Sequence, residues 1–366
     1  MMRITILCNL CLFVLLFAET GLLAQSTGEN HFYRHLKGKL GTKNITWEWH
    51  QLPETMSVKM YQTTVVMWVE GAATPYYLRG NGLQAMGDSL YLKEYHTLLM
   101  DEAEPKAHWK LRWNAVNNTM IGERIPTDLP KPQEVSLREQ YPKGVLRMEP
   151  EWLMRRSNNE QSKAVASIWG LEVRSGSKKA QMRINAWLQD SLYQQASVFM
   201  NGFIQNYEND AALGLTQTHE EAYKKIRITH NTDQTLSVLL ERFISHGLGQ
   251  PEYQLSAYIF DSHTGELIPP QALFLPQTED TLGRLLAQTL RQVAKVPPSL
   301  SLADYGFIAP DERLPVSQNI ILVGEGLCFI YNPYEISSAA AGTITLYLPY
   351  KQLKGLIHTA KVPKFR

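Results

Sequence analysis

The chain has 366 residues, of which 44% are hydrophobic and 19% are charged, and its formal net charge is +1. A chain of this length can bury a core large enough to fold without disulfides, and it suggests two or three domains. The balanced charge and the absence of a dense basic tract argue against a nucleic-acid-binding protein.

The first residues have the three-part pattern of a secretory signal. Arg3 is followed by an apolar run at residues 4–17 and by small and polar residues at 18–26. The run is shorter than the span of about 20 residues that crosses a membrane. We therefore predict a signal peptide over residues 1–25, cleaved near Ala24, and an exported protein, periplasmic or extracellular, without a transmembrane anchor after cleavage.

After the predicted cleavage, the cysteines allow no internal disulfide. Neither Cys8 nor Cys11 has the small residues before it that lipid attachment requires, although a lipid anchor and a retained signal remain alternatives. Cleavage leaves only Cys328, inside the apolar run at residues 326–330. We expect a buried core residue there rather than a reactive thiol.

Residues 31–124 alternate apolar and polar residues in short segments separated by glycine and asparagine. Examples are residues 45–49, 89–95 and 109–113. Period-two alternation predicts an antiparallel β-rich domain, either a meander or a small barrel. Six of the eight tryptophans lie between Trp47 and Trp152. They are expected to fill the face of a sheet packed on itself, with a glycan- or peptide-stacking surface as the alternative.

Residues 125–163 contain five prolines among mixed charges and show no sustained period, which predicts a linker with one helical turn at 151–154. Residues 164–358 then predict an α+β domain with helices on one face of an antiparallel sheet. Strands are expected at 168–173, 222–229, 235–245, 253–260 and 267–274, and helices at 180–208 and 280–293.

A motif near the C-terminus is the most distinctive part of the chain. It reads Tyr-Asn-Pro-Tyr-Glu-Ile at 331–336, followed by Ala341-Gly342 and by Leu-Pro-Tyr at 348–350. Its tyrosines are expected to line a core, while a recognition edge for a partner is the alternative. Four residues are the candidate binding site: Tyr331, Asn332, Tyr334 and Glu335.

This motif, the helix centred on residues 184–188 and the hairpin that leads to residues 261–265 resemble the extracytoplasmic domain of the anti-sigma-V factor. That family senses lysozyme, and its domain also accompanies some peptidoglycan deacetylases. The N-terminal half is similar in style to secreted proteins of Bacteroidota-like bacteria. The resemblance implies a protein that binds a lysozyme-like hydrolase or a cell-wall ligand.

The chain departs from that family in three ways. Residues 245–250 read Ser-His-Gly-Leu-Gly-Gln where the family has a Gly-Gly-Ala-His turn, so no role can be carried over to His246. It shows neither a sigma-binding segment with a membrane span nor the paired metal-binding histidines of a deacetylase. Sigma-factor regulation is therefore not expected.

Four groups of titratable residues are candidates for metal binding or acid–base chemistry, and an ordinary structural role is favoured for each. They are Asp101, Glu102 and Glu104 near His108; His263 with Asp261 and Glu266; His31 with His35; and Asp304, Asp311 and Glu312. The first and last groups lie in predicted loops, and the second has the composition of a turn. The third is close enough to the new N-terminus for disorder.

No nucleophile elbow, zinc motif or phosphate loop is present. We therefore predict a non-catalytic secreted or periplasmic protein, without cofactor or metal, that binds a lysozyme-like protein or a cell-wall glycan. The alternatives are a carbohydrate-active hydrolase or deacetylase of the cell envelope with an unrecognised site, and a structural component of the envelope.

Overall fold

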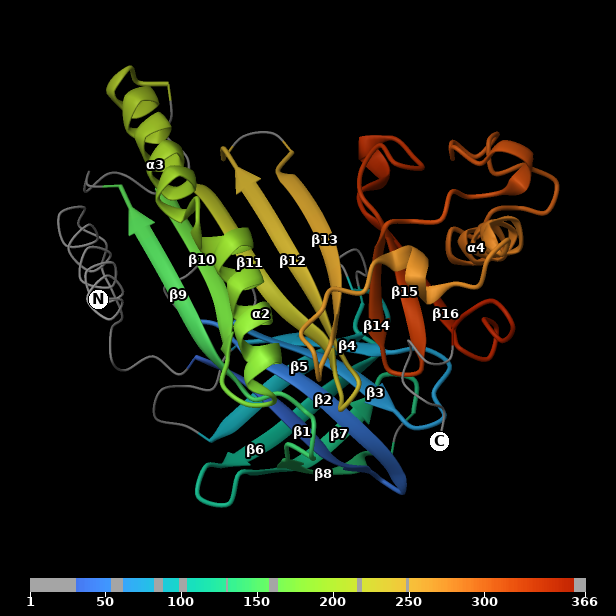
Figure 1. The fold of residues 1–366 in the computed structure, drawn as a ribbon, viewed down its shortest axis with the longest axis horizontal. Coiled ribbons are helices and arrows are strands. Elements are labelled where there is room, and N and C mark those ends of the chain that lie inside the picture. The colour runs from blue at the N-terminus through green and yellow to red at the C-terminus, as the bar shows by residue number, and fades with distance from the viewer. Residues whose placement is uncertain are drawn as a thin grey trace, which may run out of the picture.

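The computed structural model describes residues 31–53, 62–81, 88–98, 104–129, 131–157, 164–215, 219–247 and 250–358. The predicted signal peptide lies outside these residues. Three parts follow one another along the chain: a closed barrel, a five-stranded sheet and a three-stranded sheet (Figure 1). The predicted α+β class with an N-terminal antiparallel β part is confirmed, and the β part is a barrel.

The barrel consists of eight antiparallel strands, each paired with the next, and β1 pairs with β8 to close it. Alternate residues point inward, as the buried–exposed alternation of β6 shows. Trp47, Trp49 and Trp109 are fully buried in the interior, so these aromatic residues form a core. The strands are β1 (Phe32–Leu40), β2 (Lys43–Gln51), β3 (Thr63–Val69), β4 (Tyr76–Gly80), β5 (Ser89–Tyr95), β6 (Ala107–Asn114), β7 (Thr119–Pro126) and β8 (Gln133–Glu139).

The linker predicted at 125–163 is wrong, because the segment contains the end of β7, all of β8 and the strand β9 (Met148–Arg156). The helical turn predicted at 151–154 is also wrong, since these residues belong to β9. The prolines misled the prediction. Pro126 ends a strand, and Pro150 lies in β9, an edge strand, where a missing amide donor is tolerated.

The five-stranded sheet has the order β13-β12-β11-β10-β9, and only β10 and β11 run parallel. Its other strands are β10 (Ala164–Val173), β11 (Glu220–Asn231), β12 (Thr235–Ser245) and β13 (Glu252–Asp261). The crossover between β10 and β11 contains α2 (Lys178–Leu188), the π-helical turn η2 (Gln189–Tyr193) and α3 (Ala196–Ala212). These helices cover one face of the sheet through Ile184, Leu188 and Ile204 (Figure 1).

The turn after β13 forms as predicted, but the strand expected at 267–274 does not. Asp261 accepts hydrogen bonds from the amides of His263 and Thr264, at 2.9 and 2.8 Å. The returning segment makes a single β-bridge at Leu267 and then enters the 3₁₀ turn η3 (Pro270–Leu273). Two successive prolines, at 269 and 270, remove the amide donors that a strand would need.

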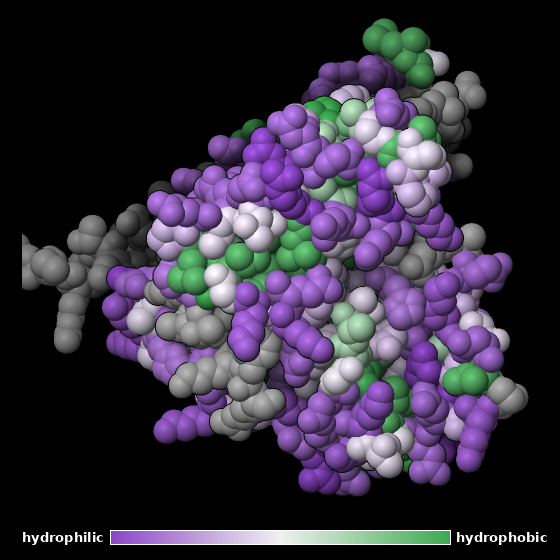
Figure 2. Space-filling view, turned by 90° about the vertical axis from the view of Figure 1, so that its right-hand side faces the viewer, coloured by the Kyte–Doolittle hydropathy of each residue, from purple (hydrophilic) through white to green (hydrophobic). Residues whose placement is uncertain are grey.

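The three-stranded sheet consists of β14 (Asn319–Val323), β15 (Gly326–Tyr331) and β16 (Ile344–Pro349), in that order. Helix α4 (Glu279–Val293) packs on it with Leu282, Leu286 and Leu290 buried, as its spacing predicted. Short 3₁₀ turns occur at Pro310–Glu312 (η4) and Ala339–Ala341 (η5). Figure 2 shows that this side of the molecule is mainly hydrophilic, with hydrophobic residues gathered near its middle.

The three parts meet in a shared cluster of buried residues. Val66 and Tyr77 from the outside of the barrel pack with Leu239 of β12 and with Ile321 and Cys328 of the three-stranded sheet. Burial raises the pKa of the Cys328 thiol to about 12, as expected of a core cysteine. Among the described residues, no helix is long and apolar enough to span a membrane.

Candidate functional site

The outer face of β1 and β2 is polar where it meets the five-stranded sheet. The residues that alternate with the inward-pointing core residues are Tyr33, His35, Glu48 and His50, and each is less than 5% exposed. Buried polar side chains require partners, because an unpaired one costs about 1–3 kcal/mol. The partners come largely from one another and from the end of β11.

A β-bulge in β11 brings that strand end to the barrel. The register between β11 and β12 shifts between Ile228 and His230, so that Thr229 is the extra residue. The Ile228 amide donates to His50 Nε2 at 3.0 Å. Thr229 Oγ1 donates to Ser237 Oγ, which also accepts from the Leu322 amide of β14. The bulge therefore joins all three parts of the molecule.

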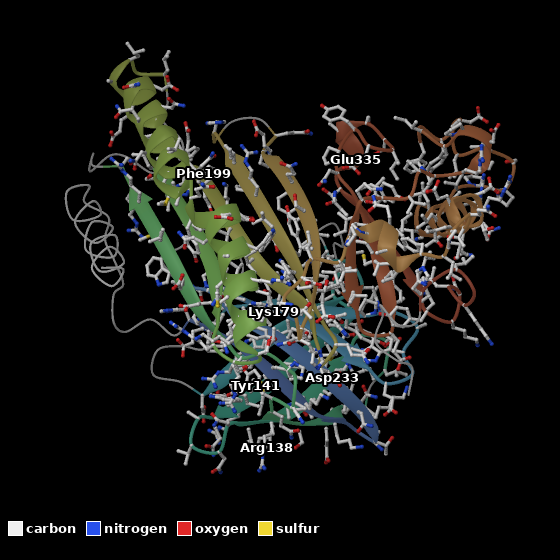
Figure 3. All side chains as sticks on the ribbon, in the orientation of Figure 1. Arg138, Tyr141, Lys179, Phe199, Asp233 and Glu335 are labelled. Carbon is white, nitrogen blue, oxygen red and sulfur yellow. The ribbon has the colours of Figure 1, made fainter. Side chains whose placement is uncertain are left out.

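A cavity of about 580 Å³, called the junction cavity below, lies beside this bulge. Its walls are the outer face of β1–β3, the loop at 142–145, the β11–β12 turn and the β14–β15 turn. In Figure 3, Asp233, which lines the cavity, and Tyr141, which contacts His35, lie where the barrel meets the sheet. The cavity volume is within the range of small-molecule sites, about 300–1,000 Å³.

One wall of the cavity is a continuous hydrogen-bond network. Glu48 accepts from the Tyr33 hydroxyl at 2.7 Å and from His35 Nδ1 at 3.0 Å. Asn231 Nδ2 donates to the Tyr33 hydroxyl at 2.9 Å and to the Leu146 carbonyl at 2.8 Å. Burial, and then the charge of Glu48, raise the pKa of Tyr33 well above its usual value, so the phenol keeps its proton.

Two histidine nitrogens at the cavity have no hydrogen-bond partner among the described residues. They are Nε2 of His35 and Nε2 of His230, and both residues line the cavity. His35 is 1% exposed, and its other nitrogen is held by Glu48. Burial lowers the pKa of His230 to about 4, which leaves its ring neutral at neutral pH.

The remaining wall combines an aromatic ring with charged groups. Trp68 is partly exposed, and the backbone of Gly324 lies against its ring, so closely that an added Cβ would be 2.1 Å from Trp68 Cε3. Gly324 begins the β14–β15 turn with a φ of +55°, a conformation that favours glycine. The exposed lining residues include two cations and two anions: Lys37, Lys143, Asp233 and Glu325.

The four predicted binding residues do not lie at this cavity. Glu335 lies at the end of the three-stranded sheet that points away from the barrel (Figure 3). Tyr331 is buried and donates to the Pro315 carbonyl at 2.7 Å. Asn332 binds the backbone of the edge strand β13, accepting from the Leu255 amide at 2.9 Å and donating to its carbonyl at 3.0 Å.

The other two motif residues are exposed. Tyr334 is 75% exposed with a φ of +72°, and Glu335 accepts from Asn332 Nδ2 at 3.2 Å. With Pro333 before it, Tyr334 occupies the position of a type II turn that requires positive φ. The structure thus divides the motif into a scaffold, Tyr331 and Asn332, and an exposed turn.

The groups of titratable residues also separate. Asp101 and Glu102 lie outside the described residues, whereas Glu104 and His108 are exposed. Asp261 and His263 form the turn described above. Asp304 binds Ser301, and Glu312 binds Arg291 and the Leu302 amide. Within the described ranges, no group of three or more His, Cys, Asp or Glu side chains could hold a metal ion.

Sequence reasoning missed the cavity residues. The disorder expected at His35 is wrong, because this residue is buried in β1. The available signal was in the alternation itself: residues 32–40 and 43–51 place apolar residues on one face and Tyr33, His35, Glu48 and His50 on the other. The row is divided between two strands, with Tyr33 and His35 in β1 and with Glu48 and His50 in β2. No local signal marked Asn231 as their partner.

The comparisons with known proteins found a family model and similar solved structures. Residues 271–351 match the family model described as "Protein of unknown function (DUF3298)". No curated protein matches the chain. A solved DUF3298 family structure from Bacteroides fragilis is 15% identical, with a TM-score of 0.48, over 59% of this chain and 94% of its own. One from Pseudomonas aeruginosa is 15% identical, with a TM-score of 0.45, over 60% and 98%.

Proposed function

We propose that this chain is an exported, non-catalytic binding protein that takes a cell-wall glycan fragment in the junction cavity. The observation that carries the proposal is the composition of the cavity wall. It combines a partly exposed tryptophan, Trp68, with neutral histidine, amide and hydroxyl groups and with charges of both signs.

This composition suits a sugar with N-acetyl and peptide substituents. Sugar hydroxyls and amides both donate and accept hydrogen bonds, so a wall that offers both roles can satisfy them. The flat ring of Trp68 can pack against the apolar face of a sugar ring. Lys37 and Lys143 can pair with the carboxylate of a muropeptide, and Asp233 and Glu325 with an amine.

Binding without turnover is the proposed mode because the buried carboxylate has a structural role. Glu48 accepts two hydrogen bonds, from Tyr33 and from His35. A general acid would instead hold a proton for the ligand. Export is proposed from the signal pattern of residues 1–25.

Isothermal titration of the mature protein with a disaccharide muropeptide and with chitotetraose tests this function. We expect saturable binding of at least one of them and about tenfold weaker binding by Trp68→Ala. Tyr91→Ala, which removes a 66% exposed ring elsewhere on the barrel, is the matched control and should bind normally. No binding of either ligand, or release of sugars or acetate during incubation, would contradict the proposal.

A second ligand, a protein such as a lysozyme-like hydrolase, is favoured by one observation. Tyr334 is 75%, Ile308 58% and Tyr305 46% exposed. Their segments adjoin, because the Ile308 amide donates to the Ile336 carbonyl. A bulky residue at positive φ is uncommon, and Tyr334 at +72° gains no burial in return. Pull-down of lysozyme by the wild type but not by a Tyr334→Gly, Ile308→Ser variant would support this ligand, and equal capture by both would exclude this surface.

A further inference from the structure

We propose that His35 is the residue that selects the ligand of the junction cavity, by accepting at Nε2 a hydrogen bond from a ligand hydroxyl or amide N–H. This inference rests on the proposed function and deepens it, because it specifies which ligand group the site recognises, a hydroxyl or an amide N–H. It makes the preferred ligand a neutral hydrogen-bond donor, such as a sugar hydroxyl or an N-acetyl group, at the innermost wall.

The first step is the tautomer of His35. Nδ1 lies 3.1 and 3.0 Å from the two oxygens of Glu48. The Tyr33 hydroxyl already donates to Glu48, and Tyr33 itself accepts from Asn231, so the direction of the chain is set. Glu48 therefore acts as an acceptor, and the proton of a neutral His35 ring lies on Nδ1. Nε2 then carries the lone pair.

The second step is that Nε2 accepts no hydrogen bond from any of the described residues. Nε2 is buried, and no donor there binds it. His35 is 1% exposed, so bulk water does not satisfy it. His35 also lines the cavity, and our proposal places there the ligand donor that binds Nε2. An orphaned buried acceptor is energetically unfavourable, and a ligand that donates to it would remove that cost.

The third step is that the neighbouring groups favour the same ligand chemistry. His230 also lines the cavity with an unpartnered Nε2, and its ring is neutral. The His230 ring therefore offers no fixed charge to a ligand carboxylate. The cations, Lys37 and Lys143, are exposed lining residues instead. The inner wall thus suits the uncharged part of the ligand and the rim its charges.

Two variants distinguish the roles of the two ring nitrogens of His35. Asn places its amide near the position of Nδ1, so His35→Asn keeps a donor to Glu48 and loses the cavity acceptor. Gln reaches the position of Nε2, so His35→Gln keeps the acceptor and loses the bond to Glu48. We expect His35→Asn to weaken chitotetraose and muropeptide binding about tenfold, and His35→Gln to weaken it less than threefold. His108→Asn, at an exposed position, is the control.

Imidazole ¹⁵N spectra of the folded wild type provide a readout that a merely structural role would not change. Nε2 of His35 should have the shift of an unprotonated nitrogen and move on ligand addition while remaining unprotonated. A protonated Nε2, or wild-type affinity in His35→Asn, would overturn the role of His35 while leaving the proposed function intact. Absence of binding by the wild type would overturn both.

Discussion

The two faces of β1 and β2 differ in the kind of side chain that they bury. The inner face buries Leu36, Trp47 and Trp49 in an apolar barrel core. The outer face, one residue away at each step, buries Tyr33, His35 and Glu48 in a hydrogen-bonded junction. The same period-two alternation produces both. The inner face gains stability from packing, whereas the outer face gains specificity because each of its polar groups demands a particular partner.

The largest effect is expected on the inner face. Trp47→Ala should destabilise the protein by about 3–5 kcal/mol, because it leaves a cavity beside Trp109, whose ring centroid is 5.3 Å away. Urea unfolding followed by circular dichroism measures this loss. Tyr91→Ala, on the solvent side of β5, should change stability by less than about 0.5 kcal/mol. Similar losses for the two variants would mean that the barrel interior is not the main core.

The outer face should make stability depend on pH. Burial lowers the pKa of His50 to about 3, so the folded protein keeps this ring neutral while the unfolded chain protonates it below about pH 6.5. Its contribution is fully present above pH 6.5 and is lost as the pH falls toward 3. The slope is about 1.4 kcal/mol per pH unit for each such ring.

Urea unfolding of the wild type and of His50→Gln between pH 7.5 and 4.5 tests this dependence. Gln retains an acceptor for the Ile228 amide without titrating, so this variant should lose less stability on acidification. His263→Gln, at an exposed turn, should behave like the wild type. Identical slopes for wild type and His50→Gln would show that the junction does not hold His50 neutral.

Breaking the network at its centre should have a smaller effect. Glu48→Gln replaces an acceptor of two hydrogen bonds by an amide that must present a donor to Tyr33 or to His35. We expect a loss of about 1–3 kcal/mol in the free energy of unfolding. Glu134→Gln, at an exposed position on β8, is the matched change. If both variants unfold at the same urea concentration, Glu48 is not a structural acceptor.

The smallest predicted effect concerns the second polar junction, between the terminal motif and β13. Asn332→Ala removes two hydrogen bonds to the backbone of Leu255 and should cost about 1–2 kcal/mol. Hydrogen exchange of the Leu255 amide should accelerate in this variant. Asn117→Ala, in an exposed turn, is the control. Unchanged protection of Leu255 would indicate that β13 does not depend on Asn332.

Local pattern was enough to predict the elements but not their partners. The alternation at 109–113 predicted β6, and the leucine spacing of 282–290 predicted α4, because each depends on residues close in sequence. The closure of the barrel by β8 was missed, since it pairs residues as distant as Leu36 and Glu139. The bulge at Thr229 was missed for the same reason. It is defined by its register with β12 and by its bond to Ser237.

The candidate site shows the same limit more strongly. The terminal motif attracted attention because its residue types are distinctive, yet Asn332 proves to be part of the scaffold. The cavity is lined by segments from His35 to Glu325, and none of them is distinctive alone. Only the fold brings His35 and Asn231 into one network, through Tyr33 and Glu48.

A ¹H–¹⁵N titration of the mature protein with the disaccharide muropeptide tests the central claim, that the junction of the three parts is the ligand site. We predict saturable shifts confined to the indole N–H of Trp68 and to the amides of residues 229–234 and 323–325. Shifts that cluster instead around Tyr305 and Tyr334, or an unchanged spectrum at saturating ligand, would contradict it.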